Sequence, residues 1–204
     1  SELVAQVGLP RLLSSFVQTT FQSFWGQFGW MGVLLDQRLY QALAVVSFLA
    51  AAGFGLRFAG LWRQRRRLPR WQWLAAGLLA LWALMTLASY IWYNLQFVQH
   101  QGRYLFRALV PIGLAVVLGW QEALERRSAI PLAGLLLLGG AALWATGQIT
   151  NWPLLMIVAT AIFLAVRCYL PVPLDPFVTA SPYLFLILLD VVSLFWFIVP
   201  QLAL

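Results

Sequence analysis

Two arginines beside a short polar loop are the best candidate for a ligand site in this sequence. Arg103 and Arg107 lie at the start of a long apolar run. If that run is an α-helix, their guanidinium groups lie about one turn apart near its N-terminus. Unpaired backbone N–H groups and guanidinium groups both favour anions, so the pattern predicts a site for a phosphate or pyrophosphate. The predicted ligand-binding residues are Arg103, Arg107, Tyr104, Gln101 and His100.

The same residues allow a second interpretation. Arg103 and Arg107 would extend toward ordinary phospholipid headgroups, and His100 would be solvated in a loop. An imidazole titrates near neutral pH and often acts as a general base. His100 is the only histidine of the chain, however, and we do not expect it to be catalytic.

A carboxylate inside an apolar run is the second feature of interest. Asp190 lies within the last apolar run, where an ionisable group is unfavourable unless it faces protein or water. Arg57 and Arg167 lie near the inner ends of two other runs. We expect a structural ion pair between Asp190 and one of these arginines. The alternative is a proton or substrate relay. A relay needs further ionisable groups within the membrane, and a single carboxylate makes a poor pathway.

Several kinds of chemistry are excluded by composition. With one cysteine, Cys168, and one histidine, the chain cannot form an internal disulfide, a multi-cysteine metal site or a haem site with two histidine ligands. It also lacks a P-loop, a dinucleotide-binding fingerprint, a GxSxG elbow and an HExxH motif. We therefore expect no metal and no cofactor to be bound by this chain alone.

Long apolar runs must position these residues. The chain has 204 residues, of which 62% are hydrophobic and 9% charged, whereas soluble domains carry about 25% charged residues. Runs that are long enough to cross about 30 Å of hydrocarbon cover residues 39–60, 71–93, 105–121, 130–147, 153–170 and 183–203. They are continuously apolar rather than alternating, which excludes a β-barrel. The sequence predicts an all-α integral membrane protein with about six transmembrane helices in one domain, 39–204.

The N-terminal segment differs from these runs. Residues 1–38 are aromatic and almost uncharged, and we expect them to lie at the outer membrane interface. The alternative is a seventh, weakly hydrophobic span over 12–35. The first residues do not resemble a signal peptide. We expect the chain to be the processed or C-terminal part of a longer protein.

The arginines predict the orientation in the membrane. All thirteen basic residues are arginines, concentrated in the connections 61–70 and 122–129. Alternating spans place both connections on one face, which is cytoplasmic by the positive-inside rule. The N-terminal segment and the C-terminus then lie outside, where Glu2 and Asp36 are the acidic residues. The net charge of +7 therefore reports orientation and does not indicate nucleic-acid binding.

Three local patterns predict how the helices are connected. The short connection 148–152 requires the fourth and fifth spans to form an antiparallel hairpin. The segment 171–182 contains four prolines, and we expect it to be extended rather than helical. Ala51, Gly55 and Ala59 form a stripe of small residues on the first span, which is typical of close helix packing, or else of a dimer interface.

Two motifs resemble a known family. The string Ser23-Phe24-Trp25-Gly26-Gln27-Phe28-Gly29-Trp30 is followed later by Gln101-Gly102-Arg103-Tyr104-Leu105-Phe106 and Ala108-Leu109-Val110-Pro111. Over residues 1–125 the chain resembles the C-terminal half of an uncharacterised bacterial multi-pass membrane family that is grouped with the C-type glycosyltransferases. The resemblance implies sugar transfer from a polyprenyl-phosphate carrier at the outer face of the cytoplasmic membrane. It places Arg103 and Tyr104 near the lipid phosphate, and Arg107 stands where the family usually has proline.

Three functions remain open. The first is the membrane module of a glycosyltransferase-like protein, with the family's catalytic acids outside this chain. The second is a non-catalytic accessory subunit of a larger electron-transfer or photosynthetic membrane complex, in which His100 would bind a partner's pigment or metal. The third is a transporter, although the inverted repeats and broken helices of transporters are not evident. The expected partners are membrane lipids, a polyprenyl-phosphate sugar or other transmembrane subunits.

Overall fold

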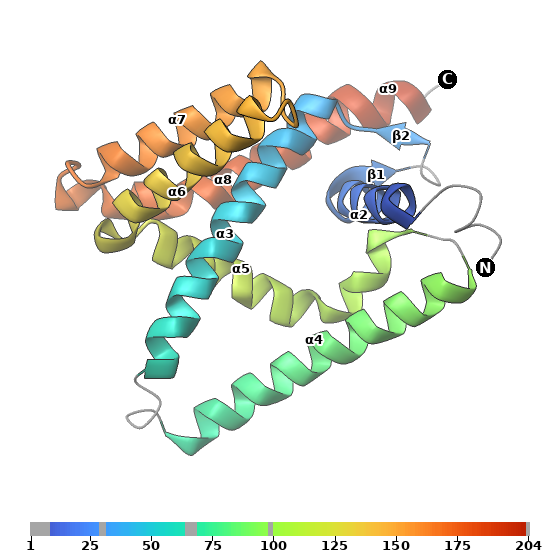
Figure 1. Cartoon of the computed structure of the whole chain (residues 1–204), viewed down its shortest axis with the longest axis horizontal. Helices are drawn as coiled ribbons and strands as arrows, with labels where there is room; N and C mark the ends of the chain where they lie inside the picture. The colour runs from blue at the N-terminus through green and yellow to red at the C-terminus, as the bar shows by residue number, and fades with distance from the viewer. Residues whose placement is uncertain (1–8, 29–31, 64–68, 98–99, 203–204) are drawn as a thin grey trace. The chain divides into compact units, whose positions relative to one another are not determined.

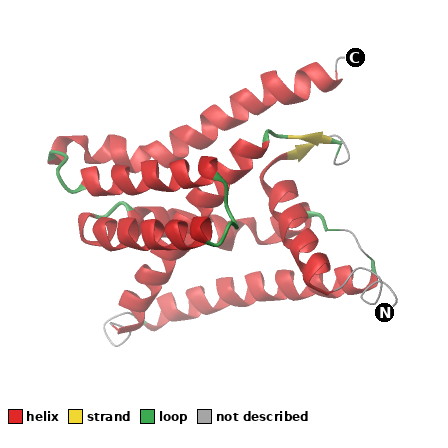
Figure 2. Cartoon of the chain, turned by 45° about the horizontal axis from the view of Figure 1, so that its top comes forward, coloured by secondary structure: helices red, strands yellow, loops and turns green. Residues whose placement is uncertain are grey.

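The computed structural model describes residues 9–28, 32–63, 69–97 and 100–202. These residues are mostly helical, with one small β-hairpin (Figures 1 and 2). The α-helices are α2 (Leu9–Gly26), α3 (Gln37–Arg63), α4 (Arg70–Gln96), α5 (Leu109–Ala123), α6 (Arg126–Ala145), α7 (Asn151–Arg167), α8 (Asp175–Val192) and α9 (Val199–Leu202). The 3₁₀-helices η2 (Gly102–Ala108) and η3 (Val172–Leu174) and the π-helix η4 (Ser193–Ile198) complete them. Strands β1 (Gln27–Phe28) and β2 (Val33–Leu34) pair antiparallel.

The membrane character predicted from the sequence is confirmed. Within the described residues, five helical segments are long and apolar enough to cross a membrane: Gln37–Arg63, Arg70–Gln96, Gly102–Ala123, Arg126–Ala145 and Val172–Ile198. Each contains most of one predicted run. The remaining run, 153–170, forms α7, which has only 17 residues. At about 1.5 Å per residue, α7 is shorter than a hydrocarbon core of about 30 Å, so helix length alone does not confirm six crossings.

The N-terminal segment is more regular than predicted. Its residues 9–26 form the amphipathic helix α2, which ends at Gly26. A Cβ added to Gly26 would lie 2.6 Å from Cδ1 of Leu35, and the chain turns into the β1–β2 hairpin at this point. Residues 12–35 are therefore not one continuous helix, and the alternative of a seventh span there is wrong. The interfacial location of α2 stays a prediction.

The chain is divided between two compact units. Unit 1 takes its residues from 1–35, 73–112 and 192–204, and unit 2 from 36–72 and 113–191. The predicted division was an outer segment, 1–38, and a single domain, 39–204. In the structure, the N-terminal segment instead shares a unit with most of α4 and with η2.

In unit 1, α2 packs closely against η2. Gly102 makes this approach possible, because a Cβ there would overlap the backbone of Thr20 and Phe24. The rings of Phe24 and Phe106 meet edge to face beside it, with centroids 5.6 Å apart. Aromatic contacts of this kind hold α2 and η2 together. Glycine is thus required here by packing.

In unit 2, α6 and α7 form the predicted antiparallel hairpin and lie side by side (Figure 1). Gly147 takes a φ of 70° in the turn between them, a conformation that glycine adopts without strain. Gly140 allows close packing, because a Cβ there would lie 2.9 Å from Cγ2 of Ile157. The core of unit 2 consists of Val45, Leu49, Ala123, Leu124, Ala129, Leu132, Ala133, Leu136, Ile157, Ala161, Leu164 and Val178.

Helix α3 packs on α5 through a different glycine from the predicted stripe. Gly53 faces Gly119, and a Cβ at either position would overlap the other helix's backbone. Ala51, Gly55 and Ala59 are exposed instead. The expectation that this stripe packs neighbouring helices within the chain is wrong for the described residues, because Gly53 lies on another face of α3.

The proline-rich segment 171–182 is largely helical, which corrects the prediction of an extended connection. Helix α8 begins at Asp175, and Pro182 lies inside it. Proline has no N–H to donate to the carbonyl four residues earlier, which is that of Val178. The Ser181 hydroxyl donates to this carbonyl at 2.7 Å. A side chain thus replaces the missing backbone hydrogen bond, and the helix continues.

Candidate functional site

A pocket of about 360 Å³ lies between α4 and η2 in unit 1, a size that suits a small ligand or a headgroup. Helix α4 contributes Met85, Thr86, Ser89, Tyr90 and Tyr93, and η2 contributes Tyr104 and Arg107. The wall therefore combines aliphatic hydroxyls, phenols and one guanidinium group. Two of the five predicted ligand residues, Tyr104 and Arg107, line it.

The α4 wall is absent from the prediction made from the sequence. Thr86, Ser89, Tyr90 and Tyr93 are spaced i, i+3, i+4 and i+7, which places them on one face of a helix. Most of the other residues of α4 are apolar. Hydroxyl-bearing residues at this spacing in an apolar span are the signal that would have located the pocket.

Tyr90 is held in place by α2. Its side chain is buried, its hydroxyl is hydrogen-bonded to Oγ1 of Thr20 at 2.7 Å, and its ring stacks on Phe16 with centroids 5.5 Å apart. The hydroxyl of the neighbouring Thr86 donates to the carbonyl of Trp82 at 3.0 Å. These contacts satisfy two buried polar groups and fix the position of the α4 wall.

Three phenol rings gather in the pocket. The ring centroids of Tyr93 and Tyr104 are 5.4 Å apart, and those of Tyr90 and Tyr104 are 6.2 Å apart. Arg103 places its guanidinium carbon 5.8 Å from the centroid of the Tyr104 ring. Such a surface offers an apolar face and hydroxyl edges to a ligand that is partly apolar and partly polar.

The two predicted arginines do not both line the pocket. Arg103 and Arg107 lie in a 3₁₀-helix, in which residues four apart are separated by about 120° around the axis. An α-helix would separate them by only about 40°. Arg107 lines the pocket, whereas Arg103 contacts the Tyr104 ring. The prediction assumed α-helical geometry, and the 3₁₀ turn separates the pair.

His100 lies beside the pocket and packs against α2. Its Nδ1 is 3.0 Å from Oδ1 of Asn94, and its ring meets Phe16 edge to face with centroids 5.1 Å apart. Burial lowers the pKa of His100 below its usual value of 6.5, because a charged imidazole is less stable away from water. The imidazole is therefore neutral at pH 7 and adds no positive charge for a phosphate.

The backbone donors at the start of η2 are partly used by the protein itself. The N–H of Gly102 donates to Oγ of Ser23 at 2.6 Å, so it is not available to an anion. The N–H of Tyr104 donates to the Gln101 carbonyl at 3.2 Å. The side-chain Oε1 of Gln101 is buried, with no hydrogen-bond partner in the described part of the chain. Arg107, rather than the helix terminus, is the positively charged group that lines this pocket.

The charged side chains described in unit 1 are all positive. Its described residues include Arg11, Arg103 and Arg107 but no aspartate or glutamate. No ion pair of Arg107 occurs among the residues that the structure describes. A guanidinium group that is not neutralised by a carboxylate favours an external anion.

The predicted ion pair of Asp190 is replaced by others in unit 2. Arg57 pairs with Glu122 and Glu125 at 3.3 and 3.2 Å, and Arg167 pairs with Asp175 at 2.9 Å. Asp190 is exposed and forms no ion pair with any described residue. The expected ion pair of Asp190 is therefore wrong for the described residues. Arg57 and Arg167 both lie at the end of unit 2 where α5 is followed by α6 and where α8 begins. Asp190, near the other end of α8, is out of their reach.

Glu122 is the centre of a charged cluster in unit 2. Its side chain is only 6% exposed, yet it accepts a hydrogen bond from Oγ of Ser128 at 2.7 Å. It also pairs with Arg57, and with Arg127 at 3.2 Å. Glu125 lies 2.7 Å from Nε of Arg127. The sequence analysis did not predict this cluster, although two glutamates followed by two arginines in 122–127 are a recognisable signal.

Some predicted features lie outside the described residues. These are Glu2, Gly29 and Trp30 of the N-terminal segment and the arginines 65–67 of the first arginine-rich connection. Among the described residues, no group of three or more His, Cys, Asp and Glu side chains could hold a metal ion. Cys168 is a partly buried free cysteine.

Comparison with known proteins adds no assignment. No protein-family model, curated protein or solved structure matches the chain.

Proposed function

We propose that unit 1 binds a polyprenyl-phosphate-linked sugar, and that the chain is the membrane module of a glycosyltransferase-like protein. One observation carries the proposal. Arg107 lines a pocket walled by hydroxyls and phenols, in a unit whose described residues contain no carboxylate side chain. The resemblance of the 101–111 motif to the C-type family favours the same class of ligand.

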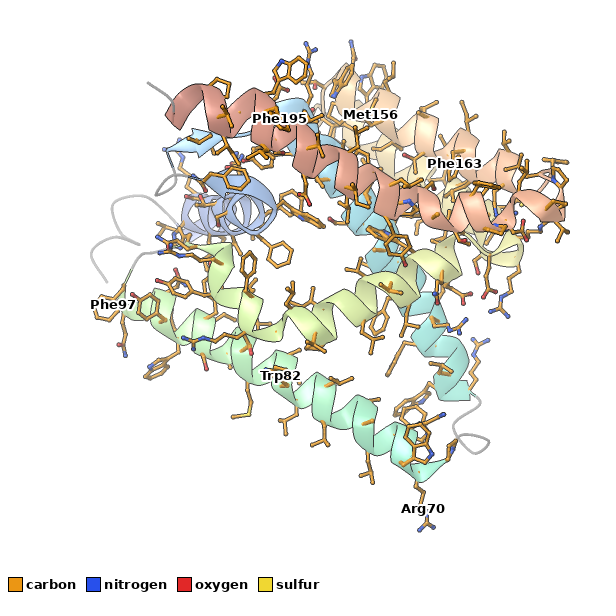
Figure 3. All side chains as sticks on the ribbon, turned by 180° about the vertical axis from the view of Figure 1, so that it is seen from behind. Arg70, Trp82, Phe97, Met156, Phe163 and Phe195 are labelled. Atoms are coloured by element: carbon orange, nitrogen blue, oxygen red, sulfur yellow. The ribbon has the colours of Figure 1, made fainter. Side chains whose placement is uncertain are left out.

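The parts of the pocket suit the parts of such a ligand. A guanidinium group binds phosphate oxygens through charge-assisted hydrogen bonds. The phenols of Tyr93 and Tyr104, which are only partly buried, offer flat apolar faces to a sugar ring and hydroxyls to its polar edges, while the buried Tyr90 supports them from behind. Outside the pocket, α4 presents apolar side chains along its length, between the labelled residues Arg70 and Phe97 (Figure 3). An isoprenoid chain is compatible with that surface.

Donor binding is proposed here, and not the chemical step. Transfer of a sugar requires a group that removes a proton from the acceptor. The residues lining the pocket include no carboxylate and no histidine. We therefore assign the catalytic base to residues that do not line this pocket, in agreement with the family resemblance, which places the catalytic acids in another part of the protein.

Six membrane crossings, with α7 as a short fifth crossing, are part of the proposal, as is location in a bacterial cytoplasmic membrane. Contacts within unit 2 support helices that alternate in direction across the membrane. The guanidinium carbon of Arg38, at the start of α3, lies 5.0 Å from the Trp152 ring at the start of α7. At the other end of the same helices, Arg57 contacts the end of α5 and the α5–α6 connection, and Arg167 contacts the start of α8. The arginine-rich end would face the cytoplasm.

Binding of decaprenyl phosphate to the purified chain in a neutral detergent tests the proposal. We expect Arg107→Ala to weaken binding about tenfold or more, since hydrogen bonds to charged groups contribute about 1.5–3 kcal/mol. Arg11→Ala is the matched control, because Arg11 is also an exposed arginine of unit 1 but does not line the pocket. It should leave the dissociation constant unchanged.

Two further probes make the binding test specific. Decaprenol, which lacks the phosphate, should bind equally weakly to the wild type and to Arg107→Ala. Tyr93→Phe should reduce affinity for a sugar-bearing donor more than for decaprenyl phosphate alone. Equal binding of decaprenyl phosphate by the wild type and Arg107→Ala would contradict the proposed function.

An accessory subunit of a larger membrane complex is the second candidate function. The observation in its favour is that, in the 27-residue helix α4, only Thr86 and Tyr90 are buried, so α4 has an extensive apolar surface for partner helices. Mild solubilisation of native membranes, followed by measurement of mass and composition, tests it. A stoichiometric protein partner is expected for a subunit, and a monomeric chain without one would exclude this function.

A further inference from the structure

Unit 2 contains a second, larger pocket at its arginine-rich end, separate from the pocket of unit 1. It has a volume of about 590 Å³ and is lined by residues of α3, α5 and α6. Three arginines line it, Arg57, Arg63 and Arg127, together with one carboxylate, that of the buried Glu122. Even with Glu125 counted, the cluster has three positive charges and two negative ones.

The arginines keep hydrogen-bond donors for a ligand. The ion pairs of Arg57 use its Nη1, and those of Arg127 use its Nε and Nη2. Each guanidinium has five N–H donors, so several remain. Arg63 forms no ion pair within the described residues. Glu122, which Ser128 also holds, thus fixes two guanidinium groups at the pocket while a third one is not neutralised.

An apolar path leads away from these charges. Ala51, Gly55, Ala59 and Arg63 follow one another at four-residue spacing on α3, and all four are exposed. Ala59 and Arg63 line the pocket. The three small residues therefore form an exposed strip of α3 that bears no large side chain and runs away from the charged end, and we call this strip the acyl groove. Their exposure, which overturned their predicted role in helix packing, leaves this groove open to a ligand.

We infer that this pocket binds an anionic phospholipid, with the phosphodiester between Arg63 and Arg127 and one acyl chain along Ala51, Gly55 and Ala59. A single phosphodiester neutralises the one excess positive charge of the cluster. Basic pockets between transmembrane helices are typical sites for anionic headgroups. The acyl chain gains from an apolar surface on which no large side chain stands. The site does not depend on the donor site proposed for unit 1.

Native mass spectrometry of the full chain with dioleoylphosphatidylglycerol tests the inference. We expect Arg63→Ala to weaken lipid binding about fivefold, the effect of about one arginine at a membrane surface. Arg63→Lys should restore most of the binding. Arg70→Ala is the matched control, since Arg70 is exposed at the start of α4 and does not line the pocket.

The acyl groove has a test of its own. A Cβ at Gly55 meets no atom within 4 Å, so we expect Gly55→Leu to fold normally, to fill the groove and to weaken phosphatidylglycerol binding. Gly77→Leu is the control, because Gly77 of α4 is equally open. Dioleoylphosphatidylcholine and inorganic phosphate should both bind more weakly than phosphatidylglycerol.

Three outcomes would overturn the inference. Equal lipid binding by wild type, Arg63→Ala and Arg70→Ala would show that no specific headgroup site exists. Unchanged binding in Gly55→Leu would remove the acyl groove. Inorganic phosphate that displaces the lipid at an equal concentration would identify a free-phosphate site instead. As a further control, Arg63→Ala should still bind decaprenyl phosphate. Failure of the phospholipid site can then be distinguished from failure of the donor site proposed for unit 1.

Discussion

The two units use arginine in different ways. In unit 2, the carboxylates Glu122, Glu125 and Asp175 hold Arg57, Arg127 and Arg167 by ion pairs of 2.7–3.3 Å. These pairs connect α3 to the α5–α6 connection and α7 to the start of α8, and so contribute to the fold. The described part of unit 1 has no carboxylate side chain. Its Arg107 instead lines a pocket together with hydroxyls and phenols.

Because these arginines of unit 2 are paired with carboxylates and Arg107 of unit 1 has no such partner among the described residues, removing a charged side chain should affect different properties in the two units. Breaking an ion pair of a buried carboxylate such as Glu122 destabilises the protein, because the remaining partner is left without compensation. An arginine without an internal carboxylate contributes little to the fold, and its counter-ion must come from a ligand. Substitutions in the unit 2 cluster should therefore lower stability, and substitution of Arg107 should lower ligand affinity.

Loss of the central carboxylate of unit 2 has the largest expected effect. Glu122→Ala leaves two arginines and the Ser128 hydroxyl without their shared acceptor, and we expect it to lower the free energy of unfolding by about 3 kcal/mol. Thermal unfolding in detergent measures the change. Glu125→Ala is the control, because that side chain is 39% exposed and exposed pairs contribute at most about 1 kcal/mol. Equal effects of the two substitutions would contradict the central role of Glu122.

Steric overlap between α3 and α5 gives the next largest effect. Gly119→Ala places a Cβ against the backbone of Ala50, and overpacking of this kind costs about 1–3 kcal/mol. Gly113→Ala, in the same helix, meets no atom within 4 Å and should stabilise α5 slightly. Thermal unfolding of the two variants compares them directly. A Gly119→Ala variant as stable as Gly113→Ala would show that the helices do not approach as described.

The smallest expected effect is a pH dependence in unit 1. Because burial lowers the pKa of His100 in the folded chain, the unfolded chain binds the proton more readily as the pH falls below about 6.5. Stability should be complete above about pH 6.5 and should decrease below it. The groups in contact with His100, Asn94 and Phe16, do not titrate. Thermal unfolding of His100→Gln should lack this decrease, and an identical pH profile for both proteins would contradict the burial of His100.

Much of the fold could be predicted from the sequence. Continuous apolar runs identify membrane-spanning helices because lipid requires apolar side chains and internally satisfied backbone groups. The connection 148–152 is too short for anything but a hairpin. The proline-rich segment 171–182 was misjudged because the Ser181 hydroxyl replaces the hydrogen bond that Pro182 cannot make. Residue types alone do not reveal that compensation.

The candidate site was predicted only in part. Arg107 and Tyr104, two of the predicted ligand residues, line the pocket, but the α4 wall and the separation of Arg103 from Arg107 were not foreseen. Hydropathy averages conceal a polar face such as that of Thr86 and Tyr90 within an apolar helix. The 3₁₀-helix η2 begins at Gly102, where α2 approaches too closely for a Cβ, and this approach is a tertiary contact. Such contacts are not encoded in local spacing.

Photo-crosslinking most directly tests whether unit 1 binds a prenyl phosphate through its hydroxyl-lined pocket. A prenyl phosphate that carries a benzophenone near its phosphate would be activated on the purified chain, and the labelled peptides would be identified by mass spectrometry. We predict labelling of α4 around Tyr93 and of η2 around Tyr104, with loss of the label in Arg107→Ala and on competition by decaprenyl phosphate. Labelling confined to α3 and α6, or unchanged in Arg107→Ala, would contradict it.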